Sequence, residues 1–512
     1  MIETLNSIYE KTILARPVVT LFFLSLILIV FSAGLRDFKI DASTDALLLE
    51  SDKDLRSFRE MSMRYKTREF MFIAVAPTTD ILSEENIDFV KRLRDELAGV
   101  TNVYDVISML DVPLLTNKPG TLAEAATNFQ TLRLATVDIE KARVELTEGP
   151  VYKDLIASAD GTVTAIQLFL DEHPQLPRLR KIRDSLLYQK HSETGLSAEQ
   201  KIELSTIEPD YQQSKLEAEE NAHNAISEIR GILQRYEQEG TARLYLGGLP
   251  MITDDLISFI GRDLIIFGSG VFIFLIIMLS VIFREARWVI LPFASCIYSG
   301  TLMLGLLGLL GWKVTIISSN FLALILIISM SMNIHLVVRY RELYRDHPNA
   351  SQLDLVRLTV QNMARPCFYT AITTIIAFAS LVISGIRPVI DFGWMMTIGL
   401  VVVFLTSFTL FPSLLLLTKK ATLKKADGNT YPLTAVLSRF TENHGKTVLL
   451  VSFCVGVAGL TGMQKLEVEN SFISYFHEDT EIYQGMSIID TQLGGTTPLS
   501  IIVDAEKDFF NY

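Results

Sequence analysis

The sequence predicts an α-helical polytopic membrane bundle with an inserted α/β extracytoplasmic domain. Three observations support this fold class. Apolar residues make up 49% of the chain and are gathered into long runs, and a run of about 18 or more can cross a bilayer as a helix. Basic residues collect in alternate loops between these runs. The polar segment between the first two runs is long enough to form a domain of its own.

Seven runs are long enough to span the membrane. We expect the spans at 17–35, 264–283, 289–310, 316–338, 366–384, 392–417 and 447–463. The first run follows Lys11 and Arg16, as a signal peptide would. Its length, and the lack of a small-residue cleavage site after Leu35, favour a retained signal anchor instead.

The loops after the second, fourth and sixth spans hold most of the basic residues near the membrane. They are Arg284 and Arg287, then Arg339, Arg341, Arg345, Arg357 and Arg365, then Lys419, Lys420, Lys424 and Lys425. The opposite turns, 311–314 and 385–391, carry one basic residue each. Because basic loops stay in the cytoplasm, the N-terminus is expected to be cytoplasmic and the large loop extracytoplasmic.

This orientation divides the chain into six parts. They are the N-terminus and first span at 1–35, an extracytoplasmic domain at 36–263, a five-helix block at 264–417, a cytoplasmic linker at 418–446, the seventh span at 447–463, and the start of a second extracytoplasmic domain at 464–512.

The extracytoplasmic domain reads as mixed α/β. Apolar alternation and β-branched residues predict strands, and helical periodicity predicts the helices between them. The strands are expected at 70–76, 102–110, 162–170 and 243–246, with helices at 83–97, capped by Ser83, and at 214–236. Two successive β-α-β units predict a ferredoxin-like, porter-type sandwich. The charged, proline-punctuated segment 171–213 reads as an insertion or a mobile arm.

The cytoplasmic segment 351–365 has apolar residues at helical spacing, with Arg357 and Arg365 off that stripe. We expect it to be a helix on the membrane surface. Glycines at 300, 305, 308 and 311 line the third span, where small residues allow close helix packing.

Two stretches of the chain resemble each other at an offset of 428 residues. Residues 40–43 match 468–471, and 71–75 match 499–503, without a gap. Parallel repeats of this kind are a known transporter architecture. We therefore expect the chain to be the first half of a longer protein, or an unusually short member, that stops inside a second copy.

Several classes of activity are excluded or disfavoured. The net charge of −12 argues against a nucleic-acid partner. Cys296, Cys367 and Cys454 all lie in apolar runs and are read as packing residues rather than disulfides. We find no P-loop, no Cys/His metal cluster and no supported serine–histidine–acid pattern, so no enzyme activity, metal or cofactor is expected.

Local motifs along the chain carry a family resemblance. Five parts of the chain resemble the MMPL branch of the resistance-nodulation-division superfamily: the tract 386–393, the end of the sixth span at 410–415, Thr370–Thr374, the motifs 247–250 and 261–264 before the second span, and 334–342. The resemblance covers the whole chain in order. It implies twelve spans in two halves, each half with a porter-like domain, in the bacterial inner membrane.

The same resemblance implies the substrates and partners. Relatives with this plan export lipids, glycolipids, hopanoids or drugs, and sterol-sensing and Patched-like proteins share the membrane fold. The implied partners are the lipid bilayer, a hydrophobic or lipid substrate and periplasmic or outer-membrane proteins; a homo-oligomer is left open.

One departure from the family pattern concerns the driving ion. Proton-driven relatives carry an acid in the fourth span, where this chain has Ser331 and Met332, and no Asp or Glu occurs between Val314 and Tyr340. Ionisable residues within spans are costly and usually functional, so this absence means that the half lacks the expected proton relay.

The candidate coupling residues each have a structural alternative. They are Ser331, Asn333, His335, Thr373 and Thr374. Asn333 could bridge helices, His335 could carry protons or bond at the interface, and the threonines could bond to their own helix. Three boundary charges join them: Asp263 near the onset of the second span, and Arg387 with Asp391, read as an anchoring pair.

The favoured function is secondary-active export of a lipid or other hydrophobic molecule, driven by an ion gradient. The missing acid favours an alternative, a non-transporting lipid sensor or assembly scaffold. A protein-export accessory resembling the SecDF proteins is a third reading.

Overall fold

The computed structural model describes residues 9–41, 57–58, 61, 64–65, 70–115, 130–134, 137–190, 195–315, 317–418, 420, 432–466 and 472–495. The chain divides into two compact units. The helical unit comprises Met1–Asp41 with Ile260–Asn470, and the α/β unit comprises Ala42–Phe259 with Ser471–Tyr512. Across the described residues seven helices are long and apolar enough to cross a membrane, which confirms the predicted number.

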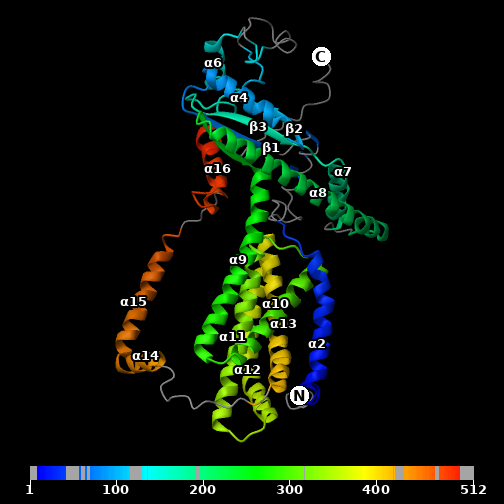
Figure 1. Cartoon of the computed structure of the whole chain (residues 1–512), viewed down its shortest axis with the longest axis vertical. Coiled ribbons are helices and arrows are strands. Elements are labelled where there is room, and N and C mark those ends of the chain that lie inside the picture. Colours follow the sequence, from blue (N-terminus) through cyan, green and yellow to red (C-terminus); the bar gives the residue numbers. More distant parts are fainter. Residues whose placement is uncertain are drawn as a thin grey trace. The chain divides into compact units, whose positions relative to one another are not determined.

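The helical unit is built from long helices that follow the apolar runs of the sequence (Figure 1). They are α2 (Pro17–Ser32), the later part of α9 (Leu249–Phe283), α10 (Arg287–Leu309), α11 (Phe321–Asp346), α12 (Gln352–Ser380), α13 (Arg387–Leu417) and α15 (Gly445–Met463). A short helix, α14 (Pro432–Asn443), precedes α15.

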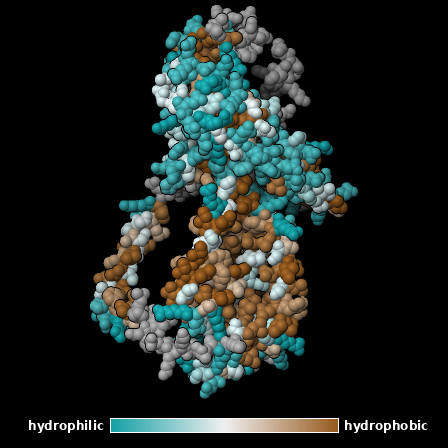
Figure 2. Space-filling view, in the orientation of Figure 1, coloured by the Kyte–Doolittle hydropathy of each residue, from teal (hydrophilic) through white to brown (hydrophobic). Residues whose placement is uncertain are grey.

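The core of the helical unit lies among α10, α11 and α13. About half of the side chains in these spans are buried, whereas the α2 span is 6% buried. Trp288, Tyr340 and Phe411 are among the largest side chains that are fully buried there. Figure 2 shows apolar surface over these helices and hydrophilic surface over the α/β unit. An apolar exterior is the expected surface for helices that face lipid.

Glycines bring α2 against α10. A Cβ added to Gly305 would overlap the carbonyl oxygen of Phe31, and one added to Gly308 would overlap that of Gly34. No side chain larger than hydrogen fits where the two backbones touch. The predicted packing role of small residues in the third span is therefore confirmed for these two positions.

Helix α12 differs from the prediction. The stretch 351–365 was expected to form a separate helix on the membrane surface, but it is continuous with the fifth span, and Pro366 lies inside the helix. Of its predicted stripe, Val356 and Val360 are buried in the same cluster as Tyr340 and Met363 packs against that cluster, whereas Leu353 is 46% exposed. The surface prediction is wrong because the stripe has a protein partner that an amphipathic pattern cannot reveal.

The α/β unit contains a four-stranded sheet in the order β2 (Val103–Ile107), β3 (Thr164–Leu170), β1 (Phe70–Pro77), β4 (Ala242–Gly248). All neighbouring strands are antiparallel, and Ile73 of β1 pairs with Ile166 on one side and Leu246 on the other. The four predicted strands are confirmed, with small shifts at their ends. Apolar, β-rich composition placed them correctly, although the burial of β1 and β3 does not alternate strictly, since Ile73, Ala74 and Val75 are all buried, as are Thr164, Ala165 and Ile166.

Helices follow the strands of this sheet. They are α4 (Glu84–Leu97), α6 (Ile139–Thr147), α7 (Leu176–Lys190) and α8 (Ala198–Glu237). Ser83 caps α4 as predicted, because its hydroxyl accepts a hydrogen bond from the backbone N–H of Asn86 at 3.3 Å. Phe89 of α4 lies edge-on against Tyr236 of α8, with ring centroids 5.5 Å apart.

The segment 171–213 is helical over most of its described residues. It forms α7 and the first part of α8, which pack against each other. Arg183 of α7 bonds Glu208 at 3.0 Å and lies 4.6 Å from the ring centroid of Tyr211, both on α8. Charge and prolines predicted an insertion or a mobile arm, and the charged Arg183 and Glu208 in it bond the two helices to each other.

A helix that follows the seventh span in sequence also belongs to the α/β unit. Helix α16 (Glu481–Gln492) contacts β4 and β1, and its Ile489 joins an apolar cluster with Ala74 and Ala165. A Cβ added to Gly485 would overlap the carbonyl oxygen of Leu246, so the helix backbone lies directly on β4. Residues 499–503, which match 71–75 at the offset of 428, lie outside the described residues.

The Gly247–Gly248 pair of the sequence motif has a structural reason here. Gly247 leaves room for the end of the Ile489 side chain, and Gly248 has φ of +126° beside the backbone of Met71. Glycine tolerates that backbone conformation, which other residues rarely adopt.

Candidate functional site

The fourth span, α11, separates the predicted coupling residues onto two faces. Ser331 and His335 are exposed, in line with Ile327 and Val338, which are 46% and 50% exposed. Positions three or four apart share one side of a helix. These two side chains therefore lie on an outward face of the described helical unit.

Asn333 lies on the opposite, packed side of α11 and is fully buried. Its Nδ2 donates to the carbonyl oxygen of Ser329 at 2.8 Å, so the amide bonds to its own helix rather than bridging to a neighbour. Its Oδ1 has no hydrogen-bond partner among the described residues. The hydroxyls of Ser295 and Ser407 are also buried and unpaired within the described part of the chain. Sequence alone did not single out these two serines, because a serine in an apolar run has no pattern that shows whether it is buried.

The threonines of α12 bond to their own backbone. Thr373 donates to the carbonyl oxygen of Tyr369 at 2.9 Å, and Thr374 donates to that of Thr370 at 2.8 Å. Thr373 is exposed and Thr374 is half-buried. Both hydroxyls therefore bond carbonyl oxygens of their own helix, as threonines in spans commonly do.

Asp263 does not lie at a helix N-terminus. Helix α9 begins at Leu249, so Asp263 lies several turns inside it, and the expected favourable effect of an acid on a helix start does not apply. The helix begins well before the predicted start of the second span, because its first turns belong to the α/β unit, where Met251 is fully buried. Asp263 lines a shallow groove with Phe267 of α9 and with Asn320 and Leu322 at the start of α11.

Arg387 and Asp391 lie one turn apart at the start of α13. The Arg387 Nε is 4.0 Å from Asp391 Oδ2, and the two side chains are 41% and 28% exposed. An exposed pair at this distance contributes little to stability. These two side chains are placed to interact with each other.

An ionic cluster in the α/β unit was not predicted. Arg230 of α8 holds both carboxylate oxygens of Asp255 at 2.9 and 2.7 Å, and its Nε donates to Glu481 of α16 at 2.9 Å. Burial raises the pKa of Glu481 above its ordinary value, although Arg230 opposes this shift. The partners are 25 and 251 residues from Arg230 in sequence, so no local pattern could have brought them together.

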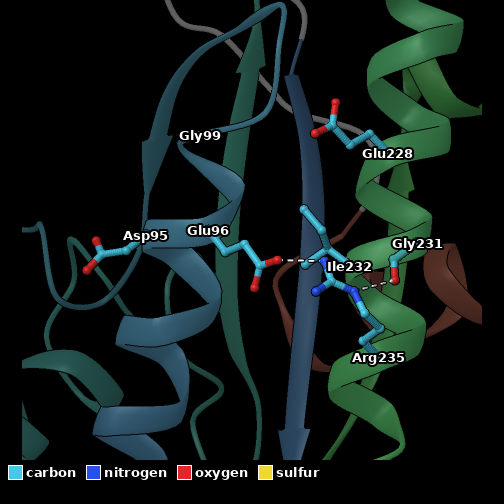
Figure 3. A pocket seen from close by; sticks show the side chains of 7 residues that line it. All are labelled: Asp95, Glu96, Gly99, Glu228, Gly231, Ile232 and Arg235. Atoms are coloured by element: carbon cyan, nitrogen blue, oxygen red, sulfur yellow. Dashed lines mark hydrogen bonds and ion pairs between the residues drawn. The ribbon is translucent and has the colours of Figure 1, made fainter.

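A polar groove lies between α4 and α8 in the α/β unit (Figure 3). Asp95, Glu96 and Glu228 line it, and Arg235 crosses it to bond Glu96 at 2.5 Å. Gly99 and Gly231 keep it open. Because charged groups line this groove and their burial against an apolar molecule would be costly, it does not suit a hydrophobic ligand.

The residues before the first span are fixed to the bundle. Tyr9 donates its hydroxyl hydrogen to the carbonyl oxygen of Phe408 at 2.5 Å, and Glu10 accepts from Arg357 at 2.7 Å and from Gln361 at 2.9 Å. These contacts tie the start of the chain to α13 and to α12. Elsewhere in the described ranges, no group of three His, Cys, Asp or Glu residues could hold a metal ion.

Comparison with known proteins agrees with this architecture. The MMPL family model matches residues 208–440. The hopanoid transporter HpnN of Rhodopseudomonas palustris is 24% identical over 413 residues, which cover 77% of this chain and 45% of that protein. A Streptomyces coelicolor protein described as a membrane protein is 23% identical over 313 residues, 57% of this chain and 36% of that protein. The chain thus spans less than half the length of these relatives.

Proposed function

From the premise that this chain is an MMPL-type multi-pass membrane protein of the resistance-nodulation-division superfamily, we propose that it takes part in export of a lipid or other hydrophobic molecule out of the bacterial inner membrane. The observation that carries the proposal is the similarity to a hopanoid transporter over 77% of the chain. Seven apolar helices and an α/β unit with its own core support a part of such an exporter.

The orientation and the fold of the α/β unit belong to the same proposal. The basic loops support a cytoplasmic N-terminus and a periplasmic α/β unit. The strand order β2-β3-β1-β4 with antiparallel neighbours supports a ferredoxin-like, porter-type domain. The predicted second periplasmic domain after residue 464 also remains a proposal, and its helix α16 packs on the first sheet.

Coupling to an ion gradient is proposed to use the outward face of α11. His335 is the one histidine between Val314 and Val338, an imidazole being a side chain that can accept and donate a proton, and it is exposed on the same side as Ser331. Asn333, Thr373 and Thr374 bond to their own helices, which supports a packing role for them. In this proposal protons move through His335 rather than through a carboxylate.

The direct test is lipid movement in proteoliposomes. The purified chain, and the longest gene product that contains it, would be reconstituted with a fluorescent phospholipid or a fluorescent sterol. We expect both probes to leave the membrane faster when a proton gradient is imposed. Vesicles without protein and vesicles without a gradient are the controls. Probe movement no faster than in protein-free vesicles would exclude export, and equal rates with and without the gradient would exclude coupling.

The role of His335 has its own matched control. The His335→Ala change should abolish the gradient-dependent part of the rate and keep the gradient-independent part. Thr409→Ala removes a half-buried hydroxyl in α13 that bonds its own helix at 2.7 Å, and it should leave both parts unchanged. A rate that still responds to the gradient in His335→Ala would remove the histidine from the mechanism.

A second candidate is a lipid-sensing or assembly scaffold. It is favoured by one observation, the absence of any Asp or Glu between Val314 and Tyr340. A scaffold would bind the sterol probe in a saturable way and would not move it, with or without a gradient.

A further inference from the structure

Arginine side chains gather where the end of α9, the start of α10 and the end of α11 lie together. Helix α9 ends at Phe283 and α10 begins at Arg287, and both are long and apolar enough to cross a membrane. Trp288 of α10 lies beside Tyr340 of α11, with ring centroids 5.5 Å apart. A short turn between two spans lies at the level of the lipid headgroups, so the arginines here are placed at that level.

Two of these arginines lie over aromatic rings. The Cζ atom of Arg287 is 4.5 Å from the ring centroid of Trp288, and that of Arg341 is 5.3 Å from the ring centroid of Phe283. Trp288 is fully buried and Phe283 is 5% exposed, so neither ring is free to swing away. A guanidinium has five N–H donors in one plane, and stacking on a ring fixes that plane without using up the donors at its edge.

A third arginine occupies the turn itself. Arg284 follows Phe283 directly, its side chain is exposed, and its φ is +54°. Residues other than glycine seldom adopt this left-handed conformation, whereas glycine adopts it without strain. The turn therefore carries a basic side chain at a position where the backbone would favour glycine.

The charge of this region is positive overall. Residues 283–288 and 339–346 contain five arginines, two glutamates and one aspartate. One glutamate, Glu342, is bonded to Arg339 at 2.6 Å, and the other, Glu285, lies in the turn. This surface would therefore attract an anion, and at headgroup level the anions at hand are phospholipid phosphates.

We propose that Arg284, Arg287 and Arg341 form a binding site for the phosphate of an anionic phospholipid. The edge of a guanidinium can bond two oxygens of one phosphate, and two of the three planes are already held by the rings beneath them. Phosphatidylglycerol fits this chemistry, because its headgroup has no cation of its own to balance the phosphate. The inference rests on α9, α10 and α11 crossing the membrane. It depends neither on the direction in which they cross nor on export.

Native mass spectrometry of the intact chain in detergent counts the phospholipids that stay bound. The Arg287→Gln/Arg341→Gln double variant should bind the first phosphatidylglycerol about tenfold more weakly than the parent, because two cations near the headgroup are lost. The matched control, Arg365→Gln/Arg439→Gln, removes two exposed arginines of α12 and α14 and should bind as the parent does. Equal losses in both double variants would mean a general attraction to basic protein, and the proposal would be wrong.

Arg284→Gly separates lipid binding from folding. Glycine relaxes the turn, so this variant should unfold in lipid-free detergent at the temperature of the parent or higher, while it binds phosphatidylglycerol several-fold more weakly. Arg287→Lys/Arg341→Lys keeps both charges and should still bind more weakly than the parent, because lysine lacks the planar fork. Parent-like binding by either variant would contradict the site as assigned.

Two further ligands show whether the site recognises a lipid phosphate. Phosphatidylcholine with the same acyl chains should bind the parent more weakly than phosphatidylglycerol, and this difference should shrink in Arg287→Gln/Arg341→Gln. Inorganic phosphate in excess should not displace bound phosphatidylglycerol, because it has no acyl chains. Equal binding of both lipids by the parent would mean that the headgroup charge is not recognised, and displacement by phosphate would indicate a site for a soluble anion. Either result overturns the proposal.

Discussion

At the scale of single residues, the positions that tolerate the fewest side chains are those where two backbones touch. The contact of α2 with α10 depends on Gly305 and Gly308, where an added Cβ would meet the carbonyl oxygens of Phe31 and Gly34. Sequence alone indicated that the third span is rich in glycine, but it could not tell which glycines face another helix. Gly270 of α9, for example, has nothing within 4 Å of an added Cβ.

We expect Gly308→Ala to lower the stability of the helical unit. Overpacking a tight contact costs about 1–3 kcal/mol, and the overlap here is with backbone that cannot rotate away. Thermal unfolding in detergent should show a lower midpoint. Gly270→Ala is the matched control and should leave the midpoint unchanged or raise it, since alanine favours a helix over glycine by about 1 kcal/mol. Equal midpoints for both variants would contradict the contact.

A second residue-scale prediction concerns Asp80. Its carboxylate bonds Arg143 at 2.6 Å and the backbone N–H of Leu82 at 2.8 Å, and the hydrogen bond to Arg143 lowers the pKa of Asp80. A lowered pKa in the folded state adds stability that is complete above the ordinary carboxylate pKa of about 3.9. That stability is lost as the pH falls through the lowered pKa.

Hydrogen exchange measures this effect in the intact chain. At pH 7, Asp80→Asn should exchange faster than the parent over the start of α4 and over α6. The difference should shrink as the pH falls below about 4 and should disappear below the lowered pKa of Asp80, where the folded parent has also lost its charge. Arg92→Gln, which removes an exposed partner of Glu239, is a control that should leave both regions as in the parent. A difference that grows toward acid pH would have the wrong sign.

At the scale of elements, the sequence predicted what periodicity encodes. All four strands, helix α4 with its Ser83 cap and the seven spans are found in the structure. What it did not predict is which element covers an amphipathic face. Val356 and Val360 of the stripe in 351–365 are buried by neighbouring helices, because burial depends on contacts that are distant in sequence.

The packing of α16 on β4 gives an element-scale prediction. Gly485→Val should separate α16 from the sheet, because any Cβ at that position overlaps the carbonyl oxygen of Leu246. Residues 481–493 should then lose protection from hydrogen exchange, while α4 keeps its protection. Gln484→Val changes an exposed neighbour and should have little effect. Unchanged protection in Gly485→Val would show that α16 is not held there in solution.

At the scale of the whole molecule, the candidate site was only partly predictable. The fourth span and its polar residues could be found from sequence. The division of Ser331 and His335 from Asn333 by helix face required the packing of α11. The ionic cluster of Arg230 and Glu481 was out of reach, because the two residues are 251 positions apart.

Membrane orientation is the prediction that belongs to this scale. The changes Lys424→Cys and Gln189→Cys would be made one at a time in a Cys454→Ser background, where the two remaining cysteines, Cys296 and Cys367, are buried. The two added cysteines should react with an impermeant thiol reagent from opposite sides of the membrane. In intact spheroplasts Gln189→Cys should be labelled and Lys424→Cys should not, until the cells are opened. If both positions reacted from the same side, the proposed orientation would be wrong.

Pro366 inside α12 has a consequence for mechanics. A proline within a helix removes one backbone hydrogen bond, and the hydroxyls of Thr370, Thr373 and Thr374 that follow it bond back to the turn before them, an arrangement that bends helices. We therefore expect α12 to bend most easily in the two turns from Pro366 to Thr374. If the fifth span flexes during a working cycle, this joint is where the bending strain will be taken up.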